Sequence, residues 1–204
     1  ESQRNQCLVI GEDLGTVPDG LREEMERRSI LTYKVLPFVK ENDGRFTSPR
    51  LYPRKALAAS GTHDMATVRG WWQGVDIDNW EKFDLLKPPL TPAGLRSDRQ
   101  IEKLKLVEML TEEGAGEFDS TAEDVPPGLI PAVSAVLARS PSLLQVIQAE
   151  DLFSEREQVN VPGTVDQHPN WRRRIPVPVE SWNNSEAALS VIESLGPRRR
   201  AGGT

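Results

Sequence analysis

The sequence predicts a parallel α/β fold, and two observations carry that prediction. Short apolar runs at residues 7–10, 31–38, 56–60 and 143–149 are each followed by a helical or mixed connection, as in repeated β/α units. Polar and acidic side chains gather where these runs end, Glu12 first among them. Because parallel strands present their carboxyl ends at one edge of a sheet or barrel, we expect a functional site along that edge.

Length and charge limit the class of protein. The 204 residues suit one domain or part of a larger one, and the formal net charge of -6 argues against a nucleic-acid-binding protein. The single cysteine, Cys7, excludes an internal disulfide and favours a reducing, cytoplasmic location. The chain begins with Glu1, and no apolar run approaches the roughly 18 residues of a membrane span. We therefore expect a soluble chain cut from a longer one, with no membrane partner.

The first half of the chain contains a predicted buried strand and two predicted helices. The run at 7–10 is expected to be a strand buried on both faces, in which Cys7 serves as a small apolar residue. A helix is expected over 16–28, with Pro18 near its first turn, and residues 67–73 are predicted to be helical.

The second half contains three further helical patterns. After an irregular excursion that includes Trp80 and Phe83, Ser97 and Gln100 match a capping box that opens a helix ending near Gly114. Its predicted apolar stripe consists of Ile101, Leu104, Val107 and Leu110. Residues 129–138 read as a buried helix, and a last helix, capped at Asn184 or Ser185, is expected to bury Leu189, Ile192 and Leu195.

Three motifs in chain order resemble those of a known family. They are GEDLG at 11–15, GTHD at 61–64, and NVPGT at 160–164, the last followed by PNWRR at 169–173. Each falls at or after a predicted strand end. Together they resemble the 4-α-glucanotransferases, also called amylomaltases or disproportionating enzymes, of the α-amylase clan.

The resemblance implies a fold. Residues 1–196 would form the C-terminal half, about strands five to eight, of a (β/α)8 TIM barrel with irregular loop insertions. The helical segment 181–195 would close the barrel, and residues 197–204 would be a disordered tail. The N-terminal half of the barrel would be a missing partner.

The resemblance also implies a chemistry: retaining transfer of α-1,4-glucan segments between maltooligosaccharides, with no metal and no organic cofactor. By motif, Glu12 matches the general acid/base and Asp64 the transition-state stabiliser. His63 matches a histidine that binds hydroxyls of the same sugar. Asn160 and Gly163 match a loop that lines the acceptor side.

The chemistry sets physical requirements. A retaining transfer uses two carboxyl groups about 5 to 5.5 Å apart, one a nucleophile and the other a proton donor. Glu12 must hold its proton until the leaving oxygen departs, so we expect surroundings that raise its pKa, whereas Asp64 should stay ionised. The family's nucleophile, and an arginine two residues before it, have no match in this sequence. The chain alone is therefore expected not to transfer glucan.

Simpler explanations remain open for the other polar and aromatic groups. Asp13 is expected to be structural, and Glu150 and Asp151 to orient a neighbouring loop. Trp71 and Trp72 could stack on sugar, although at least one is expected in the core, and Trp171 is expected to anchor packing. The remaining candidates are Arg172, Arg173 and Arg174, expected to pair with surplus acids, and His63, His168 and Cys7, which lack the spacing of a zinc site.

Two other functions remain open from the sequence. A hydrolase of the same clan would use the same carboxylates, with water in place of the acceptor hydroxyl. A truncated, non-catalytic glucan-binding protein would bind glucan without transferring or hydrolysing it.

Overall fold

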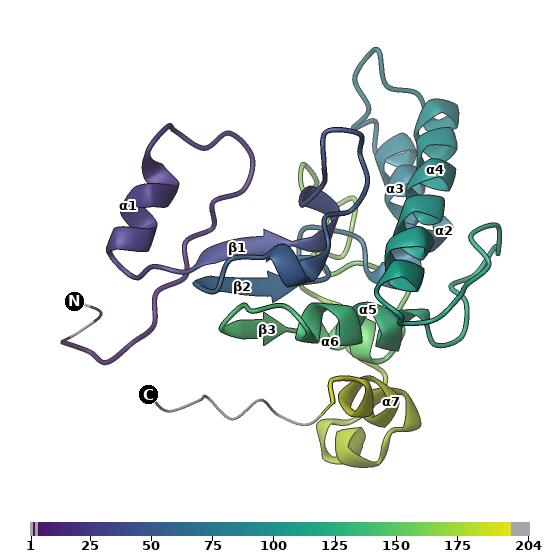
Figure 1. Ribbon diagram of the computed structural model, residues 1–204. Helices are drawn as coiled ribbons and strands as arrows, with labels where there is room; N and C mark the ends of the chain where they lie inside the picture. Colours follow the sequence, from purple (N-terminus) through teal and green to yellow (C-terminus); the bar gives the residue numbers. More distant parts are fainter. Residues whose placement is uncertain (1, 3, 197–204) are drawn as a thin grey trace.

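The computed structural model describes residues 2 and 4–196, with a small parallel sheet near its centre (Figure 1). The strands are β1 (Thr32–Val35), β2 (Ala56–Ala59) and β3 (Leu144–Val146), paired in that order and all parallel. The predicted α/β class with parallel strands is confirmed. The tail predicted at 197–204 lies outside the described residues.

The first predicted strand is reduced to a bridge. Ile10 pairs with Leu31 in parallel, and the Leu31 amide donates to the Val9 carbonyl at 3.0 Å. This run continues the parallel order beside β1, but at the edge of the sheet. The prediction that it is buried on both faces is wrong, since its four residues are exposed: Cys7, Leu8, Val9 and Ile10.

Helices follow and separate the strands. They are α1 (Leu21–Arg27), α2 (Val68–Gln73), α3 (Val75–Lys82), α4 (Pro92–Glu112), α5 (Leu129–Ala138), α6 (Ala149–Leu152) and α7 (Glu186–Ser194), with 3-10 turns η1 (Leu36–Phe38), η2 (Pro49–Leu51) and η3 (Val179–Asn184). The strands run toward the side of the molecule where α2, α3 and α4 gather, and α1 lies at the opposite end (Figure 1). In the described part of the chain no helix combines the length and the apolar composition needed to cross a membrane.

Three predicted helix boundaries are wrong, each for a local reason. Helix α1 begins five residues later than expected, because Gly20 adopts a left-handed conformation (φ 79°) directly before it. The excursion around Trp80 is the regular helix α3, which starts after left-handed Gly74. Helix α4 begins at Pro92, because the Thr91 hydroxyl caps it by accepting from the Gly94 amide at 3.1 Å.

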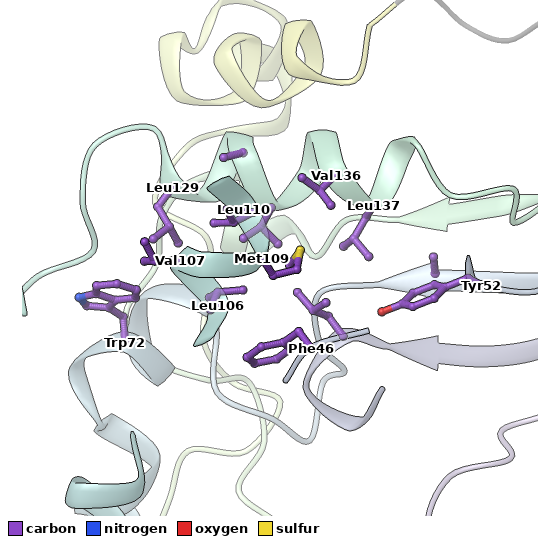
Figure 2. Packing of buried hydrophobic residues seen from close by; sticks show 14 residues of the cluster. Phe46, Tyr52, Trp72, Leu106, Val107, Met109, Leu110, Leu129, Val136 and Leu137 are labelled. Carbon is purple, nitrogen blue, oxygen red and sulfur yellow. The ribbon is translucent and has the colours of Figure 1, made fainter. Parts of the chain in front are cut away.

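The core lies where α4 and α5 meet the sheet and the loops that follow it. In Figure 2, Met109 and Leu110 of α4 lie among α5 side chains such as Leu137 and beside Phe46. The predicted α4 stripe is half right. Leu110 is fully buried and Val107 is 9% exposed, whereas Ile101 and Leu104 are 51% and 48% exposed. The N-terminal half of α4 instead turns Arg99 and Lys103 inward.

Helix α7 packs against α5 with a different face from the one predicted. Ser185 caps it, as expected, by accepting from the Ala188 amide. Ala188 and Val191 are buried, while Leu189 and Ile192 are 38% and 50% exposed. The small side chain of Ala188 allows close approach of the two helices. A prediction based on hydrophobicity alone does not take side-chain size into account.

The two leucines of α4 provide a matched test of this packing. Leu110→Ala should lower the free energy of unfolding by about 2–5 kcal/mol, because it opens a cavity in the core. Leu104→Ala removes the same atoms from a half-exposed site and should change it by less than about 1 kcal/mol. Urea denaturation followed by circular dichroism measures both. Equal effects would contradict the burial described for α4.

Candidate active site

The parallel order brings the polar ends of the strands to one edge of the sheet. Glu12 follows the bridge at Ile10, and Asp64 follows β2. Gln148 and Glu150 follow β3 on the other side of β2. Residues that are distant in sequence therefore share one region, as expected for the carboxyl ends of β/α units.

Asp64 is the centre of the closest cluster. The Asn160 side-chain amide donates to Asp64 Oδ1 at 2.6 Å, and His63 Nε2 lies 3.5 Å from the same oxygen. The side chains of His63 and Asp64 are about half exposed, at 56% and 48%. The structure thus brings together three of the predicted site residues, with one face open to a ligand.

The loop that carries Asn160 is fixed by Asn170. The Asn170 side chain accepts from the Val161 amide at 3.0 Å and donates to Thr164 Oγ1 at 2.8 Å and to the Thr164 carbonyl at 3.1 Å. Gly163 turns the same loop with φ 87°, a conformation that L side chains rarely adopt. The NVPGT and PNWRR motifs are therefore two parts of one built loop, and Gly163 shapes it from an exposed position.

Glu12 does not lie in the buried surroundings that its predicted role requires, because the residue is exposed. One electrostatic contact ties it to the site. Burial raises the pKa of the Tyr33 phenol, and the charge of Glu12 raises it further. Tyr33 projects from β1 and lines a cavity that His63 also lines. Tyr33 therefore lies within reach of the charge of Glu12 and also lines the cavity beside His63.

Asp13, next to Glu12, is a buried structural carboxylate. It accepts from the Thr32 hydroxyl at 2.6 Å, the Tyr33 amide at 2.8 Å and Arg22 Nε at 2.8 Å. Burial alone would raise the pKa of Asp13, but these hydrogen bonds, with the Thr32 hydroxyl foremost, hold it below its ordinary value. Asp13 therefore fixes the loop that presents Glu12 against β1.

A cavity of about 340 Å³ lies beside His63. The Trp171 ring, 63% exposed, stands 5.0 Å from the His63 ring at an interplanar angle of 48°. The interpretation of Trp171 as a packing anchor is wrong, because the residue is largely exposed, at a position where the backbone is left-handed (φ 62°). Sequence reasoning missed Tyr33 and Gln148 in this wall; the alternation of β1 and the position of Gln148 after β3 were the available signals.

The paired tryptophans divide between core and surface. Trp72 is 1% exposed, and its indole nitrogen donates to the Ala122 carbonyl at 2.9 Å, so the core prediction is confirmed for it. Trp71 is half-buried, with the Arg99 guanidinium carbon 4.7 Å from its ring centroid.

Asp151, in α6 after β3, is a second buried carboxylate. It accepts from the Val68 amide at 2.7 Å and from the Ser60 hydroxyl at 2.8 Å, and so joins the start of α6 to the end of β2 and to the start of α2. Burial raises its pKa to about 6, and the neighbouring Glu150 charge adds to the rise. The expectation that Asp151 orients a neighbouring loop is confirmed.

Two of the remaining charged candidates, Arg173 and His168, make contacts within the chain. Arg173 lies 3.4 Å from a Glu157 carboxylate oxygen, which agrees with the predicted ion pairing. The buried His168 ring contacts the Gln158 carbonyl at 3.2 Å. Within residues 2 and 4–196, no cluster of three or more His, Cys, Asp or Glu side chains could hold a metal ion.

Comparison with known proteins identifies the family. A family model described as 4-alpha-glucanotransferase matches residues 1–179, which include the whole of the site above. The chain belongs to the 4-alpha-glucanotransferase family. A relative named 4-alpha-glucanotransferase from Haemophilus influenzae is 32% identical over 203 residues, and one from Mycobacterium tuberculosis is 30% identical over 176 residues.

Solved amylomaltase structures share the fold. Amylomaltase from Corynebacterium glutamicum superimposes with a TM-score of 0.83 at 23% identity over 95% of this chain. Amylomaltase from Streptococcus agalactiae in complex with acarbose gives 0.61 at 18% identity over 96%. The chain spans 29% of the Haemophilus glucanotransferase, whose match covers 98% of this chain, and 24% of the mycobacterial one, whose match covers 84%. It spans 29% and 32% of the two solved chains.

The buried carboxylate of Asp151 should make stability depend on pH. Its folded pKa of about 6 lies above the ordinary 3.8, so its contribution to stability is complete below about pH 4 and is lost as pH rises through 6. Asp151→Asn keeps an acceptor for the Val68 amide and should flatten this part of the profile. The exposed loop variant Asp166→Asn should leave it unchanged. Urea midpoints from pH 4 to 7 measure the difference.

Asn170 offers a second test, on the loop that holds Asn160. Asn170→Ala removes the acceptor of the Val161 amide and both contacts to Thr164. Hydrogen exchange at Val161 should accelerate by at least about tenfold. Exposed Asn183→Ala serves as the control. Unchanged exchange in Asn170→Ala would mean that the loop is held by other contacts.

Proposed function

We propose that this chain is the C-terminal half, about strands five to eight, of a (β/α)8 barrel in a cytoplasmic 4-α-glucanotransferase. Its reaction is the retaining transfer of α-1,4-glucan segments between maltooligosaccharides, without a metal or an organic cofactor. The observation that carries the proposal is the cluster of His63, Asp64 and Asn160 at the same sheet edge as Glu12, inside the part of the chain that matches the family.

In this proposal Asp64 stabilises the oxocarbenium-like transition state. Asn160 donates a hydrogen bond to Oδ1, and among the described residues no hydrogen bond to Oδ2 is present, on a side chain that is 48% exposed. An ionised carboxylate fixed at one oxygen can accept sugar hydroxyls at the other and hold them more tightly as positive charge develops. His63, adjacent and half exposed, binds hydroxyls of the same sugar, and the loop with Asn160 and Gly163 lines the acceptor side.

Glu12 serves as the general acid/base. A proton donor needs a raised pKa, which burial provides. Glu12 is exposed in this chain. In the whole barrel, the other half would cover Glu12 by closing over the edge beside residues 7–10. The exposed apolar side chains of Leu8 and Ile10 support such a cover, since they are otherwise costly in water.

The nucleophile is proposed to lie outside these 204 residues, on the other half of the barrel. Retaining chemistry needs a carboxylate about 5 to 5.5 Å from Glu12 across the scissile bond. The partial coverage of the relatives supports this division, because the chain accounts for only 29% of the Haemophilus protein.

Incubation with maltotriose tests the proposal. The isolated chain should produce neither longer nor shorter oligosaccharides, because it lacks the nucleophile. A chimera in which it replaces the matching part of the Haemophilus relative should yield a ladder of glucan lengths by chromatography. In the chimera, Glu12→Gln and Asp64→Asn should each lower transfer by at least about 100-fold. Glu23→Gln, on exposed α1, is the control.

The alternatives give other results in the same experiment. A rise in reducing ends without a ladder would indicate a hydrolase of the same clan. Glucan binding without turnover in the chimera would indicate a non-catalytic binding protein. Transfer by the isolated chain would contradict the proposed location of the nucleophile.

A further inference from the structure

A cavity of about 270 Å³ lies apart from the candidate active site, between the junction of α2 and α3, helix α4 and residues 121–123. None of its lining residues lines the cavity beside His63. Gly74, at the junction of the two helices, forms part of the wall in a left-handed conformation (φ 77°). Because a side chain at this position would lie 3.1 Å from Arg96 Nη1, the glycine leaves room for the Arg96 guanidinium.

Three cationic side chains line this cavity, and two of them are arginines that are already paired. Arg96 forms an ion pair with Asp78. Arg99 donates to the Asp76 carboxylate at 3.0 and 2.7 Å, and its Nε lies 3.6 Å from a Glu102 carboxylate oxygen. These three acids are not among the lining residues, so they balance the arginines from behind the wall.

Lys103, the third cation, is buried without a carboxylate partner. The residue is 3% exposed, and Nζ donates to the Ala122 carbonyl at 3.3 Å, a long contact to an oxygen that also accepts from Trp72 Nε1 at 2.9 Å. Nζ lies 4.7 Å from the centroid of the Trp72 ring. In the described part of the chain no carboxylate oxygen lies within ion-pair distance of Nζ. Burial lowers the pKa of Lys103, and the charge of Arg99 lowers it further.

A buried ammonium of this kind favours an anion. Lysine is rarely so fully buried unless an opposite charge accompanies it, because removing the ammonium from water is costly. Contacts with a carbonyl and an aromatic face offset only part of that cost. An ammonium has three donors, and the described residues use one of them. Two donors are therefore available to a ligand in the cavity.

The remaining polar groups of the wall are compatible with an oxyanion. Gln100 lies one turn before Lys103 on α4, so its side-chain amide can reach the same ligand. Glu123 is the one acid among the described lining residues, and it is exposed. A lysine ammonium and an arginine guanidinium are both common ligands of phosphate oxygens. The volume leaves room for a phosphate group that carries a small organic substituent.

We propose that this cavity binds a small oxyanion of the phosphate class, as free phosphate or as a phosphate ester, with the Lys103 ammonium as its principal contact. Gln100 and Arg96 provide further donors from the neighbouring wall. The inference does not depend on the proposed function, because the cavity shares no lining residue with the cluster of His63, Asp64 and Asn160.

Calorimetric titration of the full 204-residue chain with inorganic phosphate, at constant ionic strength, tests the site. The wild-type chain should bind phosphate with a Kd on the order of 1 mM, as expected for a few charge-assisted hydrogen bonds. Lys103→Met keeps an apolar stem and removes the ammonium, so it should raise this Kd at least about tenfold. Lys105→Met removes the same charge from a half-buried position of the same helix, outside the cavity, and should leave the Kd within about twofold.

A second variant keeps the test decisive if circular dichroism shows that Lys103→Met does not fold. Gln100→Glu places a carboxylate one turn from Lys103 and supplies the missing charge from within the chain. It should raise the Tm by about 1–2 °C and weaken phosphate binding at least about fivefold. Asn183→Asp adds the same charge at an exposed position outside the cavity and should change neither value.

Three results would overturn the site. They are absence of phosphate binding by the wild-type chain up to about 20 mM, unchanged binding in folded Lys103→Met or in Gln100→Glu, and binding that appears only in Glu123→Gln. In the last case Glu123 would be the counter-ion of Lys103 in solution. Glycerol phosphate distinguishes the two sources of the anion: tighter binding than that of inorganic phosphate would assign the cavity to a phosphate ester, and weaker binding to the free ion.

Discussion

The parallel pairing of β1, β2 and β3 is the constraint on which the rest of the structure depends. Parallel strands must be joined by crossovers, so each strand delivers the residues after it to the same edge. His63 and Asp64 arrive there from β2, and Gln148 from β3. The long crossover between β2 and β3 contains α2 to α5, and of these α2, α4 and α5 contribute side chains to the core.

Two kinds of carboxylate follow from this arrangement. Asp13 and Asp151 are buried and tie loops to strands, whereas Glu12 and Asp64 are exposed. The pKa values of the buried pair shift in opposite directions. Burial tends to raise both, but Asp13 is hydrogen-bonded by three donors including the cationic Arg22, while Asp151 has two neutral donors and a neighbouring anion. The buried carboxylates of Asp13 and Asp151 therefore fix the chain near the site, while the exposed carboxylates of Glu12 and Asp64 are accessible to a ligand.

The loop over 160–164 gives the site its second wall. Asn170 determines its shape through backbone contacts, and Asn160 then reaches Asp64 from outside the sheet. Gln158 also holds this loop, since its side-chain amide nitrogen donates to the Asn160 carbonyl at 2.7 Å. Because Asn170 bonds to Val161 and Thr164, the NVPGT and PNWRR motifs belong to a single structural unit.

The sequence by itself determined the α/β class and the positions of the later strands, because short apolar runs are local properties. It indicated His63, Asp64 and Asn160 only through motifs that resemble a family, and the structure brings these three residues together. It also identified Asp13 as structural. Only the tertiary structure decided that Trp171 is exposed, that Tyr33 and Gln148 line the site, and that α4 turns Arg99 inward. These outcomes depend on what packs against each residue, and periodicity does not specify the packing partner. The exposure of residues 7–10 has the same cause: burial of a strand is a property of its neighbours in the sheet, not of its own side chains.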